Sequence, residues 1–198
     1  MPRAPRPAPL ILASRSPRRR ELLSEAGYTF DVVPPRSAEE HKPSSGEDPA
    51  DYVARLAAAK AADVVEQVGR GLVLGCDTVA ECDGQILGKP ESADDARRML
   101  ELLGGQEHRV LTGLCLWPAP QGKRLERVAI TTLRMDSLTP DQLYEYIASG
   151  QWEGKAGGFG YQDRLGWVHI IDGSPSNVVG LPLELLAEML ATIDASLH

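Results

Sequence analysis

The chain has 198 residues, of which 42% are hydrophobic and 25% are charged, and its formal net charge is −7. These fractions are ordinary for a globular protein, and the length is sufficient for one sizeable domain. The acidic balance argues against binding to bulk nucleic acid or to a membrane surface, because both favour a basic protein. No apolar run approaches the roughly 20 residues that a membrane span needs. A small anionic ligand at a locally basic cleft fits this composition better.

The N-terminal segment and the cysteines add two further limits. Residues 1–9, MPRAPRPAP, are too polar and too rich in proline for a signal peptide, so we predict a disordered arm followed by a single domain over 10–198. Cys76, Cys82 and Cys115 lack the spacing of a metal site, and their odd number argues against a disulfide framework. A reducing cytoplasm fits this cysteine usage.

Strands and helices are predicted in an irregular order along the chain. The first half contains a strand from Leu10, a helix over 17–27, a strand over 29–33, a helix from Pro49 to about Gln67, and strands over 72–82 and 85–87 joined by a turn at Asp83-Gly84. The second half contains a helix over 92–104, strands over 109–117 and 127–135, a helix over 139–150, a strand over 167–171 and a helix over 180–193. Because no strict βαβ period appears, we predict an α/β fold with a mixed central sheet flanked by helices.

The first predicted helix begins with a charge conflict. Ser16 is suited to cap it and Pro17 to its first position, yet Arg18, Arg19 and Arg20 fill the first turn. A helix N-terminus already carries partial positive charge, and each exposed cation there costs about 0.3–1 kcal/mol. A polyanion bound at the turn would remove the conflict. Arginines that extend into water are the alternative, which this segment leaves open.

Two charged residues stand where the local pattern requires apolar ones. Asp77 lies inside the strand pattern LVLGCDTVAEC, and Lys60 lies on the apolar stripe of the helix that follows Pro49. A buried carboxylate must be paired, hydrogen-bonded or bound to metal, so Asp77 is a candidate general base or metal ligand at a cleft. Solvent exposure at the strand end for Asp77, and an extended stem with the ammonium in water for Lys60, are the alternatives.

Three further positions carry weaker signals. Lys89 lies between Gly88 and Pro90, and the proline favours an extended backbone that aims its side chain. Lys155 lies in the glycine-rich GKAGGFGYQD, where the backbone is able to approach a ligand closely. Glu40 lies in a long polar loop, and its carboxylate is a hard oxygen ligand of the kind that Mg²⁺ binds beside a phosphate. Each of these positions also fits a solvated loop.

Taken in order, five blocks resemble the Maf family of nucleoside triphosphate pyrophosphatases. They are LILASRSPRRRELL, LGCDTV, LGKP, KAGGFGYQ and VVGLPL. The resemblance covers almost the whole chain from Leu10 onward. It implies an elongated, two-lobed fold with a central cleft, related to the inosine-triphosphate pyrophosphatases, and a homodimer. It also implies hydrolysis of a nucleoside triphosphate to the monophosphate and diphosphate with a divalent cation.

Residue by residue, the resemblance assigns roles to positions of this chain. Asp77 matches the proposed proton acceptor, and Arg18, Thr78 and Gln162 match the residues that set substrate choice in the subfamily acting on dTTP and UTP. In the subfamily acting on 7-methyl-GTP, a Trp, a Gln and a Glu occupy those three positions. Two features depart from the family pattern. FGYQD stands where YGIQG is usual, and GSPSNVVGLP contains an Asn associated with several subgroups.

These observations combine into one hypothesis for the site. Ser14, Arg18 and Arg19 contact the phosphates, and Lys60, Lys89 and Lys155 complete the positive clamp. Mg²⁺ or Mn²⁺ is held by Asp77 and Glu40, Asp77 accepts a proton from the attacking water, and Thr78 with Gln162 reads the base. The rival hypotheses are a 7-methyl-GTP or inosine-type pyrophosphatase and a non-catalytic nucleotide-binding regulator of cell division.

Overall fold

The computed structural model describes residues 9–36, 42–163 and 166–196. Its centre is a seven-stranded mixed sheet in the order β2-β1-β3-β5-β6-β7, with β4 paired to β3. β1 is parallel to β2 and β3, and the other pairs are antiparallel. The strands are β1 (Leu10–Ala13), β2 (Phe30–Val32), β3 (Gly71–Cys82), β4 (Gln85–Leu87), β5 (Glu107–Ala119), β6 (Leu125–Met135) and β7 (Val168–Asp172). The predicted α/β fold with a mixed sheet flanked by helices is confirmed.

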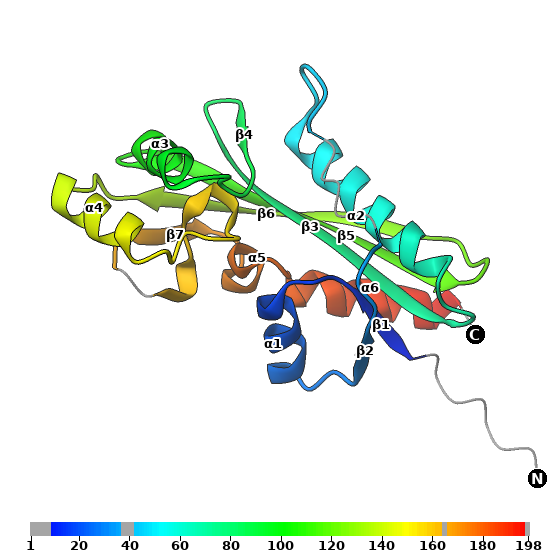
Figure 1. Ribbon diagram of the computed structural model, residues 1–198. Helices are drawn as coiled ribbons and strands as arrows, with labels where there is room; N and C mark the ends of the chain where they lie inside the picture. Colours follow the sequence, from blue (N-terminus) through cyan, green and yellow to red (C-terminus); the bar gives the residue numbers. More distant parts are fainter. Residues whose placement is uncertain (1–8, 37–41, 164–165, 197–198) are drawn as a thin grey trace, which may run out of the picture.

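Helices cover both faces of this sheet. They are α1 (Pro17–Glu25), α2 (Pro49–Val65), α3 (Ala93–Leu103), α4 (Pro140–Ala148), α5 (Pro175–Val179) and α6 (Leu183–Ser196), with short 3₁₀ turns η1 (Ala156–Gly158) and η2 (Tyr161–Asp163). α2 packs on one face through its alanines, and α1 and α6 pack on the other (Figure 1). Within the part of the chain that the structure describes, no helix is long and apolar enough to cross a membrane.

The long strands pass through two lobes with separate cores. At one end, Ala80 and Cys82 of β3 pack with residues of α3, α4 and β5. At the other end, Leu74 and Cys76 of β3 pack with α1 and α6. Figure 1 shows α3, α4 and β7 at one end of the strands and α1, β1 and β2 towards the other. The middle of β3, which carries Asp77, therefore lies at the junction of the two cores.

Two glycines let α2 lie unusually close to the sheet. A Cβ at Gly75 of β3 would overlap the backbone carbonyl of Ala57, and one at Gly113 of β5 would overlap that of Val53. Helix backbone therefore rests directly on strand backbone at both points. This close approach brings the side chain at position 60 of α2 within reach of β3.

Polar side chains cap several of the helix starts, but not the first one. Asp48 caps α2 through Ala50 N, and Thr139 forms the complete capping box with Gln142. The prediction for Ser16 is wrong in its bonding, because its side chain makes no capping hydrogen bond to α1. Its backbone N–H donates instead to Ser14 Oγ at 3.1 Å.

The C-terminal region differs from the prediction of one helix over 180–193. The chain forms the short helix α5 first, and Gly180, at φ +115°, ends it in a left-handed conformation. α6 then begins at Leu183. α5 is tied to the sheet by Asn177, whose Nδ2 donates to Val110 O at 3.1 Å and to Thr131 Oγ1 at 2.9 Å. A helix of five residues lacks local stability, so these tertiary bonds account for it.

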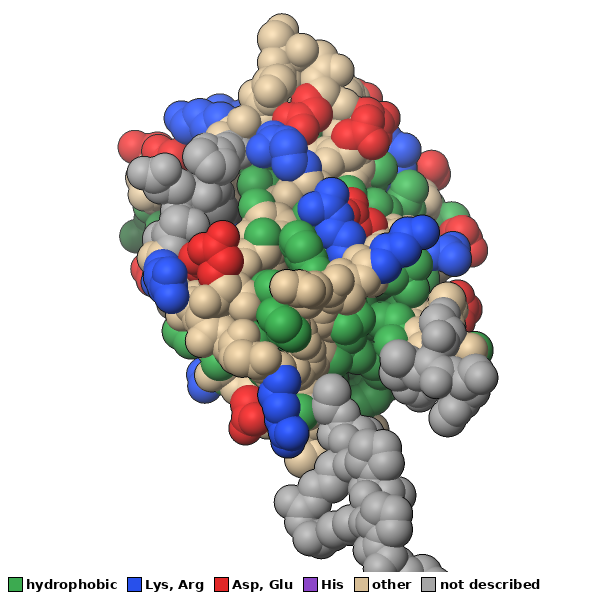
Figure 2. All heavy atoms as spheres, turned by 90° about the vertical axis from the view of Figure 1, so that its right-hand side faces the viewer, with side chains coloured by type: hydrophobic (Ala, Val, Ile, Leu, Met, Phe, Trp, Pro, Cys, Tyr) green, Lys and Arg blue, Asp and Glu red, His purple; other side chains and the backbone are tan. Residues whose placement is uncertain are grey.

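Charges of both signs are mixed on the face shown in Figure 2. Lysine and arginine side chains alternate there with aspartate and glutamate, and apolar patches lie between them. This face therefore carries no field of a single sign. The predicted N-terminal arm lies outside the described residues except for Pro9.

Candidate active site

Neighbouring residues of β3 face opposite sides of the sheet, as side chains of a strand do. Asp77 shares the α2 side with Val79, which packs in a cluster with α2. Thr78 faces the other side, where its hydroxyl lies 2.9 Å from Arg19 Nη2 and 2.9 Å from Thr112 Oγ1. The Thr78 hydroxyl is therefore engaged with protein groups.

Asp77 is a buried carboxylate with a charged partner. Its residue is 5% exposed, and Lys60 Nζ of α2 donates to its Oδ1. The Lys60 side chain retains 21% exposure, so it reaches the carboxylate from the edge of the apolar stripe. Burial of a carboxylate requires such compensation, and Lys60 supplies it. The two residues singled out by their local patterns thus form one pair.

Arg19 is buried, and its hydrogen bonds link several elements of the fold. Its guanidinium donates to Gly180 O at 2.8 Å, Cys76 O at 2.9 Å, Thr78 Oγ1 at 2.9 Å and Ser14 Oγ at 3.4 Å. These bonds use most of the five N–H groups of a guanidinium. They join α1 to both neighbours of Asp77 on β3 and to the end of α5. A phosphate contact by Arg19 stays a prediction.

The other two arginines of α1 differ from Arg19. Arg18 is half-buried, and its Nη2 donates to the carbonyl oxygen of Gly154 at 2.6 Å across the molecule. Burial, and secondarily the charge of Arg19, lower the pKa of Arg18. Arg20 is exposed. The charge conflict at the start of α1 is thus met in part by carbonyl and hydroxyl acceptors of the protein itself.

The glycine-rich segment carries a second lysine–aspartate pair. Lys155 is 8% exposed, and its Nζ donates to Asp163 Oδ2 of η2. Phe159 is also buried and contacts His108 edge to face, with ring centroids 5.3 Å apart. Burial lowers the pKa of His108 to about 4. The segment is therefore packed against the β5 side of its lobe.

One cavity of about 510 Å³ brings the predicted residues together. Those that line it are Ser14, Arg18, Arg19, Lys60, Asp77, Thr78, Lys89, Lys155 and Gln162. Glu40, the predicted second metal ligand, lies outside the described residues. The cavity thus joins the end of β1, the start of α1, the middle of β3 and the glycine-rich segment in one place.

Sequence reasoning missed several residues at this site. Glu153, Phe159 and Tyr161 also line the cavity, and Asp163 pairs with one of its lysines. Phe159 and Tyr161, the aromatic residues next to glycines in GFGYQD, were an available signal, whereas Glu153 had none. For Asp163, the one available signal was its departure from the family's usual glycine.

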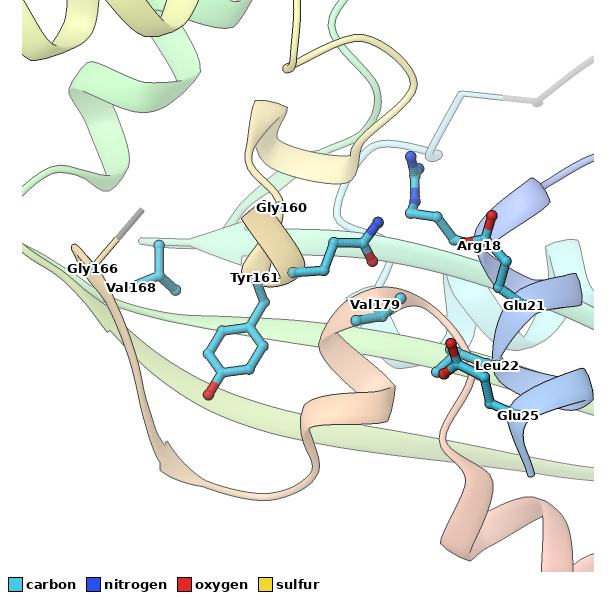
Figure 3. Close-up of a pocket in the computed structure, with 10 residues that line it drawn as sticks. Arg18, Glu21, Leu22, Glu25, Gly160, Tyr161, Gly166, Val168 and Val179 are labelled. Atoms are coloured by element: carbon cyan, nitrogen blue, oxygen red, sulfur yellow. The ribbon is translucent and has the colours of Figure 1, made fainter. Parts of the chain in front are cut away.

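A second cavity of about 790 Å³ adjoins the first (Figure 3). Arg18, Tyr161 and Gln162 line both cavities, so the two meet at these residues. Glu21 and Glu25 of α1 also line the second cavity, and Figure 3 shows them opposite Tyr161 and Val168. Among its described lining residues Arg18 is the one cation, which distinguishes it from the lysine-rich first cavity.

The donor set at the first cavity fits a metal ion that binds together with a phosphate ligand. Asp77 and Glu153 are the carboxylates among its described lining residues. The described residues contain no group of three or more His, Cys, Asp or Glu that would hold an ion by themselves. Mg²⁺ is commonly bound by one or two carboxylates and the phosphates of a substrate, which is what this set provides.

A buried carboxylate among lysines and arginines, in a cavity of a two-lobed α/β fold, is an arrangement that suits a phosphate-rich ligand. The chain belongs to the family of Maf-like proteins, which matches residues 9–193. It is 52% identical over 192 residues to a dTTP/UTP pyrophosphatase of Rhodopirellula baltica, covering 96% of this chain and 85% of that protein. It is 45% identical to a dTTP/UTP pyrophosphatase of Moorella thermoacetica, covering 92% and 93%. Identity to the same enzyme of Thermococcus onnurineus is 42%, covering 89% and 94%.

Proposed function

We propose that this protein is a pyrophosphatase that hydrolyses dTTP and UTP to the nucleoside monophosphate and diphosphate. The observation that carries the proposal is the placement of Asp77 and its lysine partner in a cavity with further cations. A triphosphate is the class of ligand that matches several cations around one buried carboxylate. The names of the relatives support the choice of dTTP and UTP.

The chain's own residues divide the work between binding and proton transfer. Ser14, Arg18, Lys89 and Lys155 bind and orient the triphosphate, so that reacting groups are held in place before reaction. Asp77 accepts the proton of the water that attacks the α-phosphorus, and diphosphate leaves. Lys60 orients the Asp77 carboxylate through their ion pair. The lysines and arginines stabilise the negative charge of the transition state.

A divalent cation belongs to this proposal as a cofactor. Asp77 would hold Mg²⁺ or Mn²⁺ together with the phosphates of the substrate, and Glu40 is proposed as the second protein ligand. When bound, the ion neutralises phosphate charge and acts as a Lewis acid.

We assign recognition of the base chiefly to Gln162. It is exposed and lines both cavities. An amide has both a donor and an acceptor, which matches the O4 and N3–H edge of uracil and thymine. The hydroxyl of Thr78 is engaged with Arg19 and Thr112, so we propose that Thr78 contributes by shaping the wall of the site.

The cysteines support a reducing compartment, for which we propose the cytoplasm. Cys76, Cys82 and Cys115 are free and buried, and such thiols persist where disulfides do not form. The homodimer implied by the family resemblance and the absence of nucleic-acid binding stay predictions.

The test is diphosphate release from a panel of nucleotides. The purified protein is incubated with dTTP, UTP, dCTP, 7-methyl-GTP and ITP in the presence of Mg²⁺ or Mn²⁺. We expect turnover of dTTP and UTP to exceed that of the others. Preference for 7-methyl-GTP or ITP would replace the substrate assignment, and binding without turnover of every nucleotide would favour a nucleotide sensor.

A further inference from the structure

Lys155 is a buried cation whose partner stands outside the cavity. The lysine lines the cavity of about 510 Å³, whereas Asp163 is not among its lining residues. The two side chains are 10% and 13% exposed, so water screens their interaction weakly. A buried ammonium is stable only with such a partner. Asp163 therefore supports Lys155 from behind the cavity wall.

Asp163 is itself held in place by its surroundings. The hydroxyl of Tyr146, from α4, lies 3.3 Å from Asp163 Oδ2 and donates to it. Tyr146 is 5% exposed and contacts Trp167 edge to face, with ring centroids 5.3 Å apart. A Cβ at Gly160 would meet Asp163 Oδ2 at 2.6 Å and Lys155 Nζ at 2.7 Å. The ion pair is thus packed directly against backbone.

The electrostatic surroundings agree with a fixed carboxylate. Burial, together with the neighbouring charge of Asp163, raises the pKa of Tyr146, so the phenol stays a hydrogen-bond donor. Next to Lys155 in the chain, the carbonyl oxygen of Gly154 accepts a hydrogen bond from Arg18 at 2.6 Å. Contacts from η2 and α4 therefore hold the side-chain end of this segment, and a contact from α1 holds its backbone.

We propose that Asp163 is a positioning residue that holds the Lys155 ammonium towards the phosphates of the nucleotide. This rests on the proposed function, because it assumes that the cavity binds a triphosphate. An ammonium has three N–H groups, so the bond to Asp163 leaves donors for a phosphate. Without the carboxylate, the Lys155 ammonium loses its buried partner and turns towards water. The loss of Asp163 therefore weakens nucleotide binding more than it slows the chemical step.

The experiment compares Asp163→Asn, Lys155→Met and the double variant. For each we measure KM and kcat with UTP, and by calorimetry the Kd of UTP carrying an imido bridge between the α- and β-phosphates. We expect Asp163→Asn to raise KM and Kd about tenfold, as for one hydrogen bond to a charged group, and to change kcat less than about threefold. In the Lys155→Met background it has no further effect, since the two residues act through one contact. Asp136→Asn, at the exposed pair with His169, is the matched control and leaves KM unchanged.

Three results overturn the inference. They are an unchanged KM in Asp163→Asn, a fall in kcat alone, and an equal effect with and without Lys155. If Asp163→Asn does not fold, Tyr146→Phe decides, because it removes the hydroxyl that orients Asp163 and is expected to raise KM about threefold with kcat retained. Failure of the parent protein to hydrolyse any nucleotide refutes the proposed function instead, and the calorimetric Kd still tests the role of Asp163.

Discussion

Two lysine–aspartate pairs meet the same cavity and differ in which partner faces it. In the pair Lys60–Asp77 both residues line the cavity, whereas in Lys155–Asp163 the lysine alone does so. A carboxylate inside the cavity is able to accept a proton from a bound water. A carboxylate behind the wall is limited to holding its lysine. If both proposals hold, the same ion-pair chemistry serves reaction in one place and positioning in the other.

The two pairs are also built on different supports. Lys60 and Asp77 project from a long helix and a central strand, which touch backbone to backbone at Gly75. Lys155 and Asp163 lie in a segment of short 3₁₀ turns, whose Gly157 and Gly158 pack against the side chains of Ala80, Leu103 and Pro90. We therefore expect the Lys155–Asp163 pair to separate more readily than the Lys60–Asp77 pair when the protein is destabilised.

The largest effect is expected for a substitution of Asp77, because this is the carboxylate of the two pairs that lines the cavity. Asp77→Asn preserves size but removes the proton acceptor, and we expect turnover of UTP to fall about 10³-fold, within the range for loss of a general base. Diphosphate release measures the loss, and thermal unfolding checks that the fold is retained. Turnover within tenfold of that of the parent protein would show that Asp77 is not the proton acceptor. The two lysine–aspartate pairs would then not differ in their role.

The stability of the protein is expected to depend on pH through His108, which packs against the segment that contains Lys155. Its pKa is about 4 in the folded protein because burial penalises the imidazolium, against about 6.5 when unfolded. Between these values the unfolded chain binds more protons, so the unfolding free energy decreases as the pH falls from about 6.5 to about 4. The decrease amounts to at most about 3 kcal/mol.

Urea unfolding at a series of pH values measures this effect. His108→Leu is the matched variant, because it lacks the titrating ring and retains an apolar contact for Phe159. Its unfolding free energy is expected to fall less steeply over the same pH window. Identical slopes for the variant and the parent protein would contradict the role of His108.

A smaller loss is expected when Lys60 is replaced. Lys60→Met leaves the Asp77 carboxylate buried without its ammonium, and we expect a destabilisation of about 2 kcal/mol, below the 3–5 kcal/mol of a fully buried pair because Lys60 is partly exposed. Adding Asp77→Asn removes the orphaned charge and is expected to restore most of the stability without restoring turnover. Urea unfolding of both variants checks this, and an additive loss in the double variant would mean that the pair is not coupled.

The smallest effect concerns the residue beside Asp163. Gln162→Glu removes the amide donor, since an ionised carboxylate only accepts hydrogen bonds. We expect kcat/KM for UTP and dTTP to fall about tenfold, equivalent to one hydrogen bond of about 1.4 kcal/mol, with little change for other nucleotides. Gln151→Glu, outside the lining of both cavities, is the control. An unchanged substrate profile would show that Gln162 does not recognise the base.

Much of the fold was predictable because its signals are local. The Asp83-Gly84 turn has positive φ at both residues, as this dipeptide predicts, and Thr139 with Gln142 forms its capping box. Asp77 and Thr78 lie on opposite faces of β3, which follows from the alternation of side chains along any strand. α5 was not predictable in this way, because its stability comes from bonds of Asn177 to strands far away in the sequence.

The sequence alone indicated the carboxylate, lysines and arginines of the cavity, but not Glu153, Phe159 or Tyr161. A carboxylate inside an apolar strand and a lysine on an apolar helix face violate local rules, and such violations are visible without a structure. Only the tertiary structure decided their partners. Lys60 meets Asp77 because Gly75 lets α2 approach β3, and Arg19 is occupied by acceptors up to 161 positions away. Hydrophobic periodicity is a local property, whereas the pairing of buried charges depends on which elements come into contact.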